Sequence, residues 1–141
     1  RLVIATTEGG YPEPTIIRLR TSDDGGETFS PPTTVAQGAI SPFGSPEVVV
    51  NQPRVATSTD GGVIAVLYLE DICDPVFGCG DPVAVVLSVS ENGGQTFSRV
   101  GTIAETYFDF SHDLSLQKDG KVIFMVTGTS GMSIFRRAVS M

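Results

Sequence analysis

Short runs of apolar and β-branched residues alternate with polar, glycine-rich segments along the whole chain. Runs such as 14–22, 63–69 and 82–90 have the length of single strands, and Gly, Asp, Asn and Pro separate them. No segment shows a sustained helical period of apolar positions with cap signals at its ends. The pattern therefore predicts an all-β fold of short strands joined by tight turns.

Two octapeptides repeat one polar pattern where such a run ends, SDDGGETF at 22–29 and SENGGQTF at 90–97. Each is followed by a further strand-like run, so each is predicted to form the turn of a β-hairpin. The glycines supply the positive φ angles of such a turn. The central Asp or Asn accepts hydrogen bonds from nearby backbone N–H groups. The two phenylalanines, Phe29 and Phe97, are expected to pack inward and close the hairpin.

A second repeated element combines a strand, an Asp-Gly turn and a hydrophobic strand, and it appears at 53–70 and 112–129. The chain is therefore predicted to repeat one four-stranded antiparallel unit. A partial unit spans 1–50, a complete unit spans 51–110, and a second partial unit spans 111–141. Four antiparallel strands repeated at this period are typical of β-propeller blades, so 1–141 is expected to be part of one propeller domain of about three blades, two of them partial.

The octapeptides resemble the Asp-box, or BNR repeat, of sialidases and related β-propellers, whose pattern is Ser-x-Asp-x-Gly-x-Thr-Trp/Phe. The resemblance implies that the boxes are fold devices on outer turns, between the third and fourth strands of a blade and away from the substrate site. The matching residues are Ser22, Asp24, Gly26, Thr28 and Phe29 in the first box, and Ser90, Asn92, Gly94, Thr96 and Phe97 in the second, where Asn replaces Asp.

Ligands of propellers usually bind at one mouth of the central channel, where the innermost strands begin. The segments 51–55 and 110–114 are predicted to lie there, just ahead of the first strand of their units. The alternative is that their polar residues hydrogen-bond neighbouring loops and cap blade ends. The candidate ligand-binding residues are Gln52, Arg54, His112 and Asp113.

Sialidase chemistry, as the resemblance implies it, uses three arginines, a Tyr nucleophile activated by Glu, and an Asp acid/base. The Phe/Tyr-Arg-Ile-Pro motif of the first arginine is absent from the chain. Glu105 and Tyr107 have suitable chemistry, but they lie in the link between two units, where an aromatic residue commonly serves packing. The sequence therefore identifies no catalytic residue and favours a protein that is not itself an enzyme.

Cys73 and Cys79 bracket five residues that include Pro and Gly, which suits a small disulfide-closed loop. Such a bond indicates an oxidising compartment: extracellular, cell-surface or periplasmic. Two free thiols are the alternative. The loop is also acidic, and it is either a solvated acidic loop or a candidate for Ca²⁺, which prefers oxygen ligands. Its acidic residues are Glu70, Asp71, Asp74 and Asp81.

The net charge of −7 argues against a nucleic-acid partner, and no apolar run has the length of a membrane span. Two hypotheses remain. The first is a sialidase-like propeller module that binds a glycan or protein ligand or serves assembly. The second is a segment of an exo-acting sialidase whose catalytic residues lie mostly elsewhere. Because unpaired sheet edges promote aggregation, we expect further blades of the same protein or other copies to complete the ring.

Overall fold

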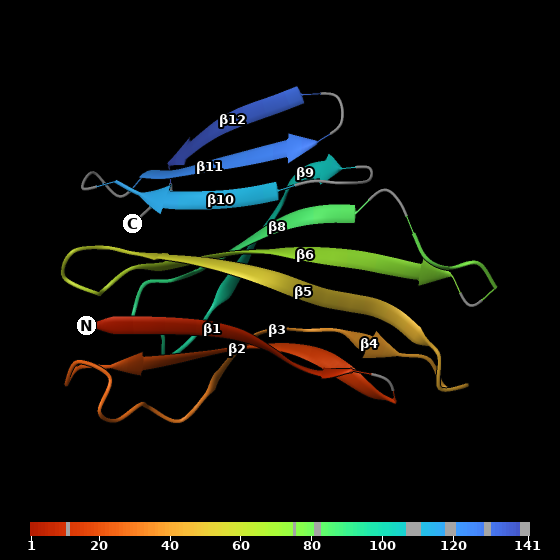
Figure 1. The fold of residues 1–141 in the computed structure, drawn as a ribbon, viewed down its shortest axis with the longest axis horizontal. Coiled ribbons are helices and arrows are strands. Elements are labelled where there is room, and N and C mark those ends of the chain that lie inside the picture. Colours follow the sequence, from red (N-terminus) through yellow and green to blue (C-terminus); the bar gives the residue numbers. More distant parts are fainter. Residues whose placement is uncertain are drawn as a thin grey trace.

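In the part of the chain that the structure describes, the regular structure consists of antiparallel strands in three sheets, which confirms the all-β prediction. In Figure 1 the first sheet lies at the bottom, the middle sheet in the centre and the third sheet at the top. The computed structural model describes residues 1–10, 12–74, 76–80, 83–106, 111–117, 121–128 and 131–138.

The sheets follow one another along the chain. The first sheet contains β1 (Leu2–Gly10), β2 (Glu13–Ser22) and β3 (Thr33–Gln37). The middle sheet has the order β4 (Ala39–Ile40), β5 (Pro46–Thr57), β6 (Ile64–Asp74), β8 (Val83–Ser90) and β9 (Ser98–Thr106), with β7 (Gly78–Cys79) paired to the end of β6. The third sheet contains β10 (Ser111–Leu116), β11 (Lys121–Gly128) and β12 (Gly131–Ala138).

Long strands that are consecutive in the chain pair within each sheet, in the grouping of three, four and three that the repeat predicts. Two boundaries differ: β5 begins at Pro46 and β10 begins at Ser111, so residues 51–55 and 111–114 lie inside these strands and not ahead of them. Three consecutive valines, 48–50, favour an extended backbone and pair with β6. A β-bulge between Asn51 and Arg54 then lets the strand continue through Pro53, which has no N–H to donate.

The middle sheet is buried on both faces, because apolar residues occupy consecutive positions of β6. The even-numbered side chains of β6 pack against β2 of the first sheet, and the odd-numbered side chains of β6 pack toward Leu114 and Leu116 of the third sheet. The buried cluster on the first-sheet side contains Ile17, Leu19, Val50, Ile64, Val66, Tyr68 and Val86. The cluster on the third-sheet side contains Ala65, Leu67, Leu69, Val85, Leu87 and Val89.

The first and middle sheets have equivalent faces that differ in burial. The first serine of each box pairs with Leu2 in the first sheet and with Ile64 in the middle sheet, so Leu2 and Ile64 are equivalent. Two residues further on, Ile4 is equivalent to Val66. Ile64 and Val66 are fully buried beneath the first sheet, whereas Leu2 and Ile4 are 47 % and 44 % exposed. Near the box end, the outer face of the first sheet thus carries two partly exposed apolar side chains that no described sheet covers, whereas Arg18 and Arg20 lie further along the same face.

The phenylalanines of the two boxes also differ in burial. Phe97 packs on the cluster between the first and middle sheets, as predicted. Phe29 is 38 % exposed, so the expectation that it packs inward is wrong. Phe97 has a neighbouring sheet to pack against, whereas Phe29 lies beside the uncovered outer face of the first sheet, where a Cβ at Gly26 would lie 4.0 Å from its ring and 3.2 Å from Leu2 Cδ1.

The two boxes build the same hydrogen-bond network, as the sequence predicts. In the first box, the Ser22 hydroxyl donates to Asp24 Oδ1 at 2.7 Å, and Thr28 N–H donates to the same oxygen at 3.0 Å. In the second box, Asn92 Oδ1 accepts from the Ser90 hydroxyl and from Thr96 N–H at 2.9 and 3.0 Å. The serine hydroxyl of each box also accepts from the backbone N–H of a glycine four residues later.

Glycine is required at position 94 for two reasons. Its φ is +91°, in the left-handed region, and a Cβ there would lie 3.1 Å from Leu19 Cδ2 and 3.2 Å from Ile64 Cδ1. The turn of the second box therefore approaches both the first and the middle sheet closely.

Asp24 is expected to make the stability of the fold depend on pH in the acidic range. Hydrogen bonds from the Thr28 side chain, from Thr28 N–H and from the Ser22 hydroxyl lower the pKa of Asp24 well below its ordinary 3.8. Because the folded pKa is the lower one, this stabilisation is complete above about pH 4 and is lost as the pH falls further. Asp24→Asn, which copies Asn92, should therefore reduce the fall in the free energy of unfolding below pH 4, measured by urea denaturation from pH 6 to pH 2.

The matched control is Glu27→Gln, which removes another carboxylate of the same turn. It should follow the wild-type profile. Identical pH profiles for Asp24→Asn and the wild-type chain would contradict the assignment of this network.

Candidate functional site

The inner edge, as we name the region where β5 contacts β10, carries the predicted site residues. β4 pairs only with the start of β5, so the remainder of β5 is an edge of the middle sheet. β10 is an edge strand of the third sheet. Two edges from different sheets therefore face each other in this region, and their side chains and carbonyls are available for contacts between sheets.

The β-bulge of β5 determines which groups point toward β10. Gln52, at the bulge, has a φ of +50°, and among the described residues it is the one non-glycine with a positive φ. Such a conformation is costly for a residue with a Cβ, and it is retained where the surrounding structure requires it. Bulges redirect side chains and carbonyls and are frequent beside functional sites. Here the bulge presents the Gln52 carbonyl to the third sheet.

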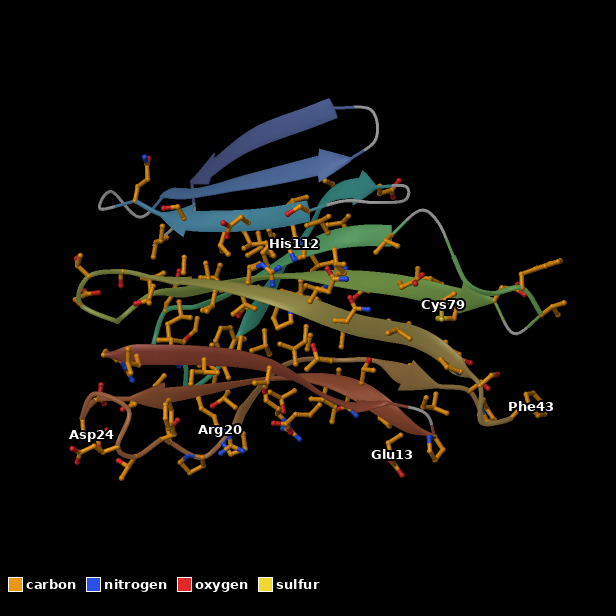
Figure 2. The ribbon with its side chains drawn as sticks, viewed as in Figure 1. Glu13, Arg20, Asp24, Phe43, Cys79 and His112 are labelled. Carbon is orange, nitrogen blue, oxygen red and sulfur yellow. A yellow bond between two sulfur atoms is a disulfide. The ribbon has the colours of Figure 1, made fainter. Side chains whose placement is uncertain are left out.

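His112 joins the two sheets at this point. Its side chain is buried, with 1 % exposed, and Figure 2 shows it between β5 and β10. Its Nε2 lies 2.7 Å from the Gln52 carbonyl oxygen, and because a carbonyl only accepts, Nε2 carries the hydrogen. Burial lowers the pKa of His112 below 6.5, opposed by the Gln52 hydrogen bond; the Arg54 charge lowers it further, and Asp113 opposes. The imidazole is therefore neutral at pH 7 and acts as a hydrogen-bonded link between the sheets.

Arg54 and Asp113 flank this link, and both are exposed. The Arg54 Nη1 donates to the Pro53 carbonyl at 3.2 Å, and Asp113 Oδ1 accepts from Leu114 N–H at 2.8 Å. The structure thus brings the four predicted residues into one region. Gln52 and His112 are joined by a hydrogen bond from the buried imidazole to a backbone carbonyl, whereas the charged side chains of Arg54 and Asp113 are exposed. A guanidinium and a carboxylate on a fixed frame suit the recognition of a polar ligand.

The proposed catalytic chemistry finds no matching geometry at the inner edge. Glu105 is exposed on β9, and β6 and β8 separate that strand from β5. Tyr107 lies outside the described residues. Of the predicted site residues at the inner edge, Arg54, His112, Asp113 and the bulge carbonyl of Gln52 provide binding groups, and one of them, Asp113, is a carboxylate.

A shallow pocket of about 410 Å³ lies over the first box, where the sequence predicts no site. Its polar atoms belong largely to the box network, and Asp24 already accepts hydrogen bonds there. The pocket also borders the exposed ring of Phe29. It is therefore part of the uncovered outer face of the first sheet and not a separate site.

The cysteine loop contains the predicted disulfide between Cys73 and Cys79. Asp74 Oδ1 accepts from Val76 N–H at 2.7 Å and from Phe77 N–H at 2.9 Å, which lowers the pKa of Asp74. Asp81 lies outside the described residues. In the described part of the chain, no three metal-ligating side chains come together. The carboxylate of Asp74 thus organises the loop itself.

Two features escaped the sequence analysis. Arg1 donates to the carbonyls of Gly61 and Gly93 at 3.1 and 3.2 Å and pairs with Asp23 at 3.2 Å, so it connects both boxes. Phe43 is 97 % exposed in the loop ahead of β5. The signal for Phe43 was present: an aromatic residue between Pro and Gly in a turn sequence has little to pack against.

The chain matches no known protein-family model, and no curated protein matches it. Among the described residues, no helix has the length and apolar character to cross a membrane.

His112 is expected to make the protein less stable between pH 7 and pH 5. Its pKa is lower in the folded than in the unfolded state, so its contribution is complete above about pH 6.5 and is lost as the pH falls. Each pKa unit corresponds to about 1.4 kcal/mol. His112→Gln keeps an N–H donor and removes the titration, and because the chain has one histidine, the loss of stability over this range should shrink.

Urea denaturation of the wild-type and His112→Gln proteins at half-unit pH steps measures the difference. Equal slopes for the two proteins between pH 7 and pH 5 would show that His112 is not held neutral by burial.

Proposed function

We propose that the three sheets are consecutive blades of a sialidase-like Asp-box β-propeller, and that the protein is a binding module of an oxidising compartment and not itself an enzyme. One observation carries the proposal: the packing of the first sheet on the middle sheet repeats in the packing of the middle sheet on the third. In both contacts, odd-numbered residues of one sheet, such as Leu19 or Leu87, pack toward the next sheet in the chain.

The positions of the boxes and of the inner strands agree with blades around an axis. Arg1 contacts Asp23 of the first box and Gly93 of the second, so both boxes lie at one end of the sheets. β5 and β10, the first long strands of adjacent sheets, contact each other. Propeller blades pair their strands in chain order and place their first strands nearest the axis. The disulfide supports an extracellular, cell-surface or periplasmic location.

The outer face of the first sheet, with Leu2, Ile4 and Phe29, is the position of a further blade in this proposal. Its equivalent in the middle sheet is the face that the first sheet covers. Full burial of one exposed aliphatic side chain contributes about 1.5–3 kcal/mol, so the packing of a further blade on this face is favourable. This blade comes from the same protein or from another copy.

The chain studied alone is expected to self-associate through this face. Ile4→Lys together with Leu2→Lys should weaken the association at least tenfold, because two lysines replace the apolar contact, and sedimentation velocity over a concentration series measures it. Gln95→Lys, an exposed position of the second box, is the control for added charge. A wild-type chain that stays monomeric at high concentration would contradict the proposed additional blade.

The ligand site of the proposed module is the inner edge. The bulge and the His112 link hold Arg54 and Asp113 on two strands, and their exposed charges suit a glycan with hydroxyl and charged groups or a polar segment of a protein. Binding is favoured over hydrolysis because the described residues of this edge lack an acid and a nucleophile placed together. The alternative is a segment of a sialidase, and hydrolysis of a sialoside, measured alongside the binding experiment described next, tests it.

A panel of immobilised neutral and carboxylate-bearing glycans provides the test, with Arg54→Gln as the variant and Arg99→Gln as the control. Arg99 is an exposed arginine on β9, where it pairs with Glu70 at 3.0 Å. Binding should fall at least tenfold in Arg54→Gln, which corresponds to about 1.4 kcal/mol, and stay unchanged in the control. Equal loss in both variants would reject the inner edge as the site. Hydrolysis of a fluorogenic sialoside would instead support the enzyme.

A further inference from the structure

Four large apolar side chains are exposed at one end of the middle sheet. Phe43 is 97 % exposed, Phe77 90 %, Val76 79 % and Ile72 71 %. Phe43 lies in the loop that precedes β5, Val76 and Phe77 lie in the loop closed by the disulfide, and Ile72 lies near the end of β6 directly before that loop. We call these four residues the apolar tip. Single exposed apolar residues are common on proteins, but several large ones together are typical of an interaction site.

The two loops lie at the same end because β5 and β6 are antiparallel. Val48, near the start of β5, pairs with Ile72, near the end of β6. Figure 2 shows Phe43 and Cys79 at one end of the molecule and Asp24 of the first box at the other. The apolar tip is thus separate from the boxes, and it also lies apart from His112 and the inner edge, which are near the middle of the strands.

Both loops hold their backbones while their apolar side chains remain in solvent. The disulfide and the two N–H groups bound by Asp74 fix the loop that carries Val76 and Phe77. In the other loop, Ser41 N–H donates to the Ser45 carbonyl at 2.8 Å, and Ser45 N–H donates to the Ser41 hydroxyl at 3.1 Å. A fixed loop loses little conformational entropy on binding, and exposed aromatic side chains commonly supply most of the binding energy.

The charge around the apolar tip indicates what covers it. The segments 41–47 and 71–80 contain Glu47, Asp71 and Asp74 and no lysine or arginine. The lowered pKa of Asp74 keeps that carboxylate ionised at neutral pH. Such a rim repels an anionic membrane and the same rim of a second copy, whereas it attracts a surface that carries cations.

We propose that the apolar tip is a docking surface for a protein partner that presents an apolar pocket bordered by lysine or arginine side chains. The partner's pocket takes up Phe43 and Phe77, and its cations face the exposed carboxylates of Glu47 and Asp74. This interaction goes beyond the ligand site of the inner edge, and it stands independently of the propeller arrangement.

Selection of a phage-displayed random 12-residue peptide library on the full chain tests the proposal, followed by affinity measurements with the enriched peptide. Enriched sequences should combine aromatic or aliphatic residues with Lys or Arg. Phe43→Ser combined with Phe77→Ser should weaken binding at least tenfold. Gln95→Ser, at an exposed position of the second box at the opposite end of the sheets, is the control and should bind as the wild-type chain does.

A second variant tests the charge without touching the apolar residues. Glu47→Lys should weaken peptide binding several-fold, and higher salt should weaken the wild-type interaction, because the attraction is electrostatic. Four results overturn the proposal. The first three are no enriched peptide, enriched peptides whose binding is unaffected by Phe43→Ser with Phe77→Ser, and flotation of the chain with phosphatidylcholine vesicles that depends on these two residues. Self-association lost in the same variant would likewise overturn it, since it identifies a second copy as the occupant.

Discussion

Burial of both faces of the middle sheet is the interaction on which the rest of the structure depends. β6 places Ile64, Val66 and Tyr68 against the first sheet and Leu67 and Leu69 toward the third, so one strand contributes to both cores. A strand that is apolar on both faces is stable only between two covering layers. The relative positions of the outer sheets, and with them the inner edge, therefore follow from this single strand and its neighbour β8.

Polar contacts at the box end orient the sheets and add little to the total stability. The exposed ion pair between Arg1 and Asp23 is worth about 0–1 kcal/mol. The hydrogen bonds of Arg1 to Gly61 and Gly93 have a different role, since they connect the turn after β5, the second box and the first sheet at one end. Apolar packing thus supplies the driving force, and the boxes with Arg1 determine the register at which the sheets meet.

This rigid arrangement leaves two regions with chemical groups that packing does not use. At the inner edge, a strained bulge and a buried imidazole hold Arg54 and Asp113 in solvent. At the apolar tip, a disulfide holds Phe77 in solvent. Each region combines a fixed backbone with exposed side chains, which is the combination that lowers the entropic cost of binding. The backbone is therefore restricted before a ligand binds at both regions, by local hydrogen bonds and, at the apolar tip, by one covalent bond.

The sequence by itself determined the strands, the hairpin turns at Ser22 and Ser90 and the Cys73–Cys79 bond, because residues close in the chain form these features. Only the tertiary structure decided that Gln52 lies inside β5 and meets His112, which is 60 residues away. It also decided that Phe97 is covered while Phe29, in the matching position, is exposed. The physical reason is that local patterns specify which face of a strand is apolar, whereas burial and contact depend on which sheet lies against that face.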